Sequence, residues 1–165
     1  DQVQIKNKAG ETYLYVTTGI SGIGGACDPS ENIDATIVET SKTAIGGEYL
    51  TLDSPDTFAT NAYAISYIEP AAKDVSTYKA GMYVGNNKST ITPGAVNECD
   101  LGYRVIAGKG DNTGLLRFGM SGVGLNGSNI RSASLDFSSR DEAVKFLKTD
   151  DAKTAYDILK SAHYN

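Results

Sequence analysis

The chain has 165 residues with a net charge of −5, no tryptophan and a single histidine. This length suits one domain, residues 1–165, with a substantial core. The mild acidity argues against a nucleic-acid partner, which needs a clustered positive surface. No run of 18 apolar residues is present that could form a membrane-spanning helix.

The first segment of the chain predicts a β-hairpin. Val3 and Ile5 alternate with glutamines, Asn7–Gly10 is typical of a turn, and Glu11–Thr17 is rich in residues that favour strands. A short strand near a chain end can pair with a neighbouring subunit. We therefore single out Val3 and Ile5 as a candidate assembly strand.

A glycine-rich stretch follows the hairpin and recurs later in the chain. Thr18–Gly25 and Phe118–Leu125 share three glycines and a serine in register. A nucleotide-binding loop of this spacing requires a helix directly after it, whereas Ala26–Ser30 leads into a strand pattern. We interpret both stretches as glycine-built bends, and their similarity fits either an internal duplication or chance in a glycine-rich chain.

Two cysteines, Cys27 and Cys99, indicate the compartment. An even number in a chain rich in serine, threonine, asparagine and glycine favours one disulfide and export, so we predict an extracellular or cell-surface protein. The alternative is a cytosolic protein with two buried free thiols. Asn87 and Asn126 begin glycosylation sequons, which matter only if the source cell glycosylates its proteins.

The polar residues after Cys27 match part of a calcium-binding loop. The residues at loop positions 1, 3, 5, 7 and 12 are Asp28, Ser30, Asn32, Asp34 and Glu39. Position 6, where the sharp turn needs glycine, is Ile33, and the segment from Ile33 onward has a strand pattern. We therefore predict no cofactor and interpret these residues as solvated turn residues beside a cysteine, with calcium binding as the alternative.

Further strand-like segments are separated by turn signals such as Gly46-Gly47. They cover Ile33–Glu39, Lys42–Ile45, Glu48–Asp53, Ala62–Ile68, Met82–Val84, Tyr103–Ala107, Leu115–Phe118 and Ile130–Phe137. Ala71–Tyr78 is ambiguous and could form one helical turn, whereas Gly85–Lys88 and Thr92–Gly94 are typical of turns.

Tyrosines recur along two of the predicted strands. Tyr13 with Tyr15, and Tyr63 with Tyr67, are two residues apart and should share a strand face. Such a row could stack on sugar rings or contact a partner surface, and the alternative is the half-buried rim of a sheet.

From about residue 139 the apolar spacing becomes helical. Ser139 and Glu142 match a capping box, in which the serine oxygen accepts from the amide of Glu142 and the glutamate reaches back to the cap. Thr149 is a second possible cap, which allows two short helices with a break between them. We predict an amphipathic C-terminal helix that covers one side of a sheet.

Many strands followed by a terminal helix predict a mainly β (α+β) fold, either an antiparallel β-sandwich or a distorted barrel with a C-terminal amphipathic helix. The lone histidine, His163, lies near the chain end and offers no fixed geometry for nucleophilic catalysis, so we predict that the protein is not an enzyme. A small secreted hydrolase that uses two carboxylates is the third alternative. The scarcity of catalytic and metal-binding side chains favours a structural subunit of an extracellular filament, coat or sheath, with copies of itself as partners. The alternative is a carbohydrate- or receptor-binding β module, with or without calcium.

Overall fold

The structure is a computed structural model that describes only part of the chain. The described residues are 2–6, 8, 12–18, 34–44, 61–71, 76–87, 92–97, 106–107, 113–118 and 136–162. Several predicted features lie outside them: both glycine-rich stretches beyond Thr18 and Phe118, Cys27, Cys99, Asn126, His163, and the segment Glu48–Asp53.

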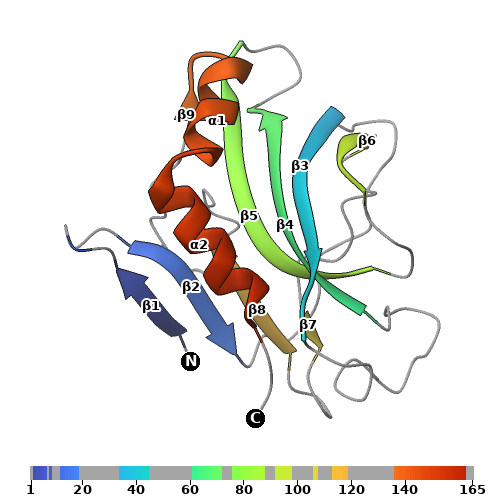
Figure 1. The fold of residues 1–165 in the computed structure, drawn as a ribbon, viewed down its shortest axis with the longest axis vertical. Coiled ribbons are helices and arrows are strands. Elements are labelled where there is room, and N and C mark those ends of the chain that lie inside the picture. Colours follow the sequence, from blue (N-terminus) through green and yellow to red (C-terminus); the bar gives the residue numbers. More distant parts are fainter. Residues whose placement is uncertain are drawn as a thin grey trace.

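The described residues form an antiparallel sheet and a C-terminal pair of helices (Figure 1). The strands are β1 (Gln2–Lys6), β2 (Thr12–Thr18), β3 (Asp34–Lys42), β4 (Asn61–Pro70), β5 (Tyr78–Asn87), β6 (Gly94–Asn97), β7 (Ile106–Ala107), β8 (Thr113–Phe118) and β9 (Asp136–Phe137). The helices are α1 (Arg140–Leu147) and α2 (Asp150–Lys160). The strand order is β1-β2-β8-β5-β4-β3-β6, with β7 beside β8 and β9 beside β5.

This arrangement confirms the predicted mainly β, antiparallel character with helix at the C-terminal end. Along the described strands the path is open, because β1 and β6 are its two ends and do not pair with each other. Neither described helix is long and apolar enough to cross a membrane.

The N-terminal hairpin is confirmed, because β1 pairs antiparallel with β2. Val3 lies in register with Val16, and Ile5 with Leu14, before the register shifts between Ile5 and Lys6. β2 then pairs with β8 rather than with its sequence neighbour, so the hairpin joins the sheet through a strand from late in the chain.

The centre of the sheet is the long pair β4 and β5, in register from Asn61 opposite Asn87 to Pro70 opposite Tyr78. The predicted strand Ala62–Ile68 is confirmed within β4. The short strand predicted at Met82–Val84 and the turn predicted at Gly85–Lys88 were wrong in extent, because β5 runs from Tyr78 to Asn87. Glycine and asparagine have low strand propensity, and here pairing with β4 overrides that local preference.

The predicted strand Ile33–Glu39 is confirmed from Asp34 onward as β3, which continues to Lys42, whereas Ile33 lies outside the described residues. Its register with β4 shifts between Ile37 and Glu39, so Val38 is the extra residue of a β-bulge. β6, which pairs with β3, was not predicted, because Thr92–Gly94 signals a turn and the strand after it is only 4 residues long.

The two helices begin at the predicted caps. Ser139 Oγ accepts from the amide of Glu142 at 3.2 Å, and Thr149 Oγ1 accepts from the amide of Ala152 at 3.3 Å. The glutamate of the capping box differs from expectation: Glu142 Oε2 accepts from the amide and the hydroxyl of Ser138, the residue before the cap. The break between α1 and α2 at Lys148 and Thr149 is confirmed.

Both faces of the central strands are buried, in two separate clusters. The helix-facing cluster contains Ala62, Ala64, Ile68, Ala80, Met82, Val84, Ala143, Leu147, Ala152, Ala155, Tyr156 and Leu159. The tyrosine cluster, on the opposite face, contains Ala35, Ile37, Tyr63, Ile65, Tyr67 and Tyr83. Alternation along each strand separates the two sets, because successive residues point to opposite faces.

Candidate functional site

The predicted assembly strand, with Val3 and Ile5, is β1, which lies at one end of the strand order. In Figure 1 it forms the left margin of the molecule, with β2 on its inner side. Among the described strands β1 has a partner only on that inner side. An edge strand of this kind presents backbone N–H and C=O groups that another strand can pair with.

The Cα register across four strands links β1 to the centre of the sheet. Val3 and Val16 continue the row of Leu116 and Val84, and Ile5 and Leu14 continue the row of Phe118 and Met82. Val84 and Met82 belong to the helix-facing cluster. Gln4 is in register with Tyr15, Arg117 and Tyr83, and of these Tyr83 belongs to the tyrosine cluster.

The structure separates the two described members of the predicted calcium set. Asp34 begins β3 and Glu39 lies five residues along the same strand. A strand rises about 3.3 Å per residue, which puts their Cα atoms roughly 16 Å apart, too far for both to bind one calcium ion directly. Asp28, Ser30 and Asn32 lie outside the described residues, within which no group of acidic, histidine or cysteine side chains could hold a metal.

The predicted tyrosine row on β4 is buried. Tyr63 is 8% exposed and Tyr67 is 1% exposed, and the ring of Tyr67 meets that of Tyr83 edge to face with centroids 5.6 Å apart. These rings therefore offer almost no surface on which a sugar could stack. Tyr13 and Tyr15 lie in β2, whose side chains are not among those described.

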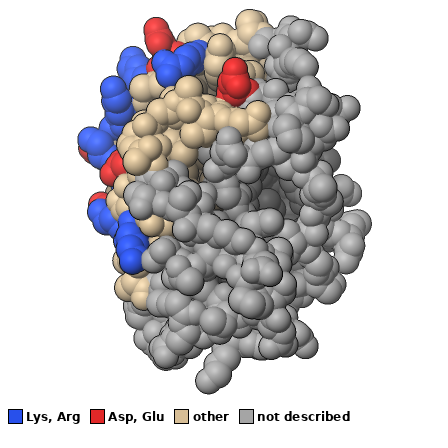
Figure 2. Space-filling model, turned by 90° about the vertical axis from the view of Figure 1, so that its right-hand side faces the viewer, with Lys and Arg blue, Asp and Glu red and all other residues tan. Residues whose placement is uncertain are grey.

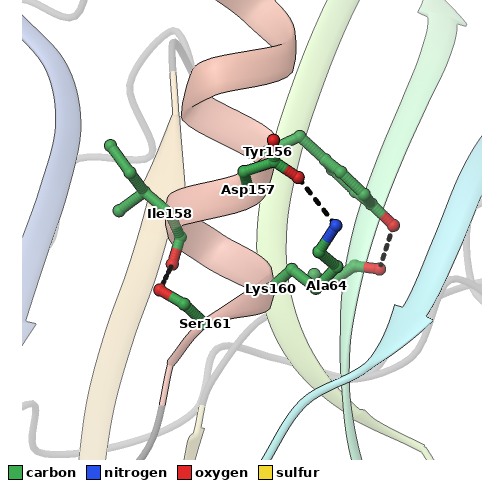
Figure 3. A network of polar contacts seen from close by, with 6 residues as sticks. All are labelled: Ala64, Tyr156, Asp157, Ile158, Lys160 and Ser161. Atoms are coloured by element: carbon green, nitrogen blue, oxygen red, sulfur yellow. Dashed lines mark hydrogen bonds and ion pairs between the residues drawn. The ribbon is translucent and has the colours of Figure 1, made fainter.

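The most developed polar contact among the described side chains joins α2 to the sheet (Figure 3). The hydroxyl of Tyr156 donates to the carbonyl oxygen of Ala64 at 3.1 Å. Burial raises the pKa of Tyr156 to about 12, the charges of Glu39 and Asp157 act in the same direction, and the hydrogen bond with Ser41 opposes them. The phenol therefore stays protonated near neutral pH and acts as a donor that fixes α2 to β4.

Glu39 reaches this region because of the bulge in β3. The bulge brings Glu39 into register with Ser66 on the helix-covered face, whereas plain alternation from Ile37 would place it on the other face. Sequence reasoning missed that the charge of this predicted calcium ligand acts on Tyr156 and Lys160 of α2. A bulge leaves no signal in the residue pattern of the bulged strand alone.

Beside Tyr156, Lys160 Nζ contacts Asp157 Oδ1 at 2.7 Å. This hydrogen bond raises the pKa of Lys160, as do the charges of Asp157 and Glu39. Both side chains of the ion pair are exposed, so water screens it and it contributes little to stability. The cluster thus holds one buried donor and a solvated rim of charges.

The outer surface of the helices is a mixture of both charges. Figure 2 shows basic side chains along one edge of the molecule with acidic ones among them. Residues 136–162 carry the basic residues Arg140, Lys145, Lys148, Lys153 and Lys160 and the acidic residues Asp136, Asp141, Glu142, Asp150, Asp151 and Asp157. The positive and negative charges nearly cancel, so this surface has no strong field of one sign that would attract a charged polymer.

Comparison with known proteins gives no match to a family model, to a curated protein or to a solved structure.

Proposed function

We propose that the protein is a structural subunit of an extracellular assembly, such as a filament, coat or sheath, and that it acts by self-association. The observation that carries the proposal is the open strand order, in which β1 is paired on its inner side alone among the described strands. A sheet with an unpaired edge can extend across a subunit boundary through main-chain hydrogen bonds.

Two further observations support this proposal. The described polar contacts between α2 and the sheet stabilise the fold, since the Tyr156 phenol donates a hydrogen bond to the Ala64 carbonyl and its pKa is raised. The burial of Tyr63 and Tyr67 removes one of the two tyrosine rows on which the alternative, a carbohydrate-binding module, depended.

We also propose that the sheet belongs to a sandwich or distorted barrel. β4 contributes residues to both the helix-facing cluster and the tyrosine cluster, so it is buried on both faces. A second layer over the tyrosine cluster, opposite the helices, accounts for that burial.

The experiment for self-association is light scattering after size exclusion, together with electron microscopy, on the purified chain from micromolar to millimolar concentration. We expect concentration-dependent oligomers and ordered particles. A chain that stays monomeric and featureless across the whole range would contradict the proposal. Binding on a glycan array by that monomer would favour the carbohydrate-binding alternative.

A further inference from the structure

We propose that β1 is a self-complementary edge, which pairs antiparallel with β1 of a second copy around a two-fold axis at Gln4. The inference rests on the proposed function and names its first contact. It commits to one partner, a second copy of this chain, and to one register of pairing.

The register follows from the sequence of β1, Gln2-Val3-Gln4-Ile5-Lys6. When two copies run antiparallel with Gln4 opposite Gln4, Val3 lies opposite Ile5 and Gln2 lies opposite Lys6. Apolar positions then meet apolar positions, and the only charged residue of the strand meets an amide. No pair of like charges is brought together, whereas like charges directly opposite each other destabilise a strand pair.

The register also aligns the rows of residues in the sheet of one copy with those in the sheet of the other. Val3 and Ile5 occupy rows that end at Val84 and Met82 in the helix-facing cluster. Pairing around Gln4 places Val3 and Ile5 of one copy in register with Ile5 and Val3 of the other, so the same rows of Cα partners continue from one sheet into the other. A shift by one residue would instead oppose Val3 to Gln4 and turn one of the faces over.

The extent of the contact is limited by the strand itself. β1 has 5 residues, and its ladder with β2 shifts register between Ile5 and Lys6. Such an irregularity twists an edge strand and shortens the length available for pairing. A contact of this size is well below a standard stable interface, so the dimer should dissociate on dilution.

Charge substitutions at Gln4 test the axis. Gln4→Lys alone and Gln4→Glu alone each place like charges opposite each other, so each variant should lose dimer in sedimentation velocity at a concentration where the unaltered chain is dimeric. An equimolar mixture of the two should recover dimer, because lysine then faces glutamate. Thr154→Lys and Thr154→Glu, on an exposed position of α2, are matched controls that should leave the dimer unchanged.

Hydrogen exchange on the unaltered chain gives a second test that does not depend on any variant folding. Amides of Gln2–Lys6 should become at least several-fold more protected as concentration rises, while those of β4 stay constant. If the chain dimerises but the Gln4 variants and the β1 amides do not respond, this interface is wrong while self-association stands. If the chain is monomeric at every concentration, both proposals fail.

Discussion

Both faces of the central strands are buried, but small side chains line one face and large side chains line the other. Beneath the helices, β4 and β5 present Ala62, Ala64 and Ala80. On the other face the same two strands present Tyr63, Tyr67 and Tyr83. The exposed fractions of these six residues all lie between 0% and 8%, so both faces are equally buried.

The difference shows how side-chain size sets what can approach a sheet. Short alanines allow α2 to come close enough for the Tyr156 hydroxyl to reach the backbone carbonyl of Ala64. On the opposite face the side chains are large rings, and Tyr67 lies over Gly81, its partner in the β4–β5 register.

The largest effect should come from removing the ring of Tyr67. Tyr67→Ala leaves a cavity in the tyrosine cluster, and we expect a loss of about 4 kcal/mol in the free energy of unfolding, measured by urea denaturation. The control is Ile158→Ala on α2, whose side chain is 37% exposed and which should cost less than about 1 kcal/mol. Equal losses at the two positions would contradict the burial of Tyr67.

Substituting Gly81 with any larger residue should destabilise the fold because of Tyr67. A Cβ at position 81 would lie 2.6 Å from three atoms of the Tyr67 side chain, so Gly81→Ala should destabilise by about 2 kcal/mol through overpacking. The same substitution in a Tyr67→Ala background should lose this cost, or gain about 0.5 kcal/mol, because alanine restricts the unfolded chain. Urea denaturation of all four chains gives the coupling energy, and additive effects would contradict the contact.

The helix-facing cluster should be sensitive to size at Ala155. This residue is 0% exposed on α2, and Ala155→Leu should cost about 2 kcal/mol because a larger side chain would push the helix away from the sheet. Thr154→Leu, one position along on the exposed side, is the matched control and should cost less than about 0.5 kcal/mol in the same denaturation assay. Tolerance of leucine at both positions would show that α2 does not pack closely.

The smallest effect concerns the Tyr156 hydroxyl. Tyr156→Phe should cost about 1 kcal/mol near neutral pH because it removes the hydroxyl that donates to the Ala64 carbonyl. Because the folded-state pKa is raised from 10.0 to about 12, this group's contribution is fully present below about pH 10 and falls as the pH rises toward 12. The difference in stability between Tyr156→Phe and the unaltered chain should therefore shrink over that range, in denaturation series at pH 8, 10 and 11.

Much of the secondary structure follows from local pattern. The hairpin positions Val3 and Ile5, the alternation within Ala62–Ile68 and the caps Ser139 and Thr149 are all where the sequence predicts them. The candidate site was predictable only in part. β1 was singled out from its alternation, but the pairing of its partner β2 with β8 depends on contacts between residues about 100 apart in the sequence. The separation of Asp34 from Glu39 became clear only with the strand that holds them.

The residue pattern by itself determined where strands alternate and where helices start, because these depend on neighbours within a few positions. The tertiary structure decided toward which face of the sheet each residue of β3 points after the bulge. It also decided how far β5 extends through its glycines. Those outcomes depend on pairing with β4, whose register no local segment encodes. Tertiary packing also made Tyr67 part of a core rather than of a surface, because burial depends on what lies against a face and not on the alternation that creates it.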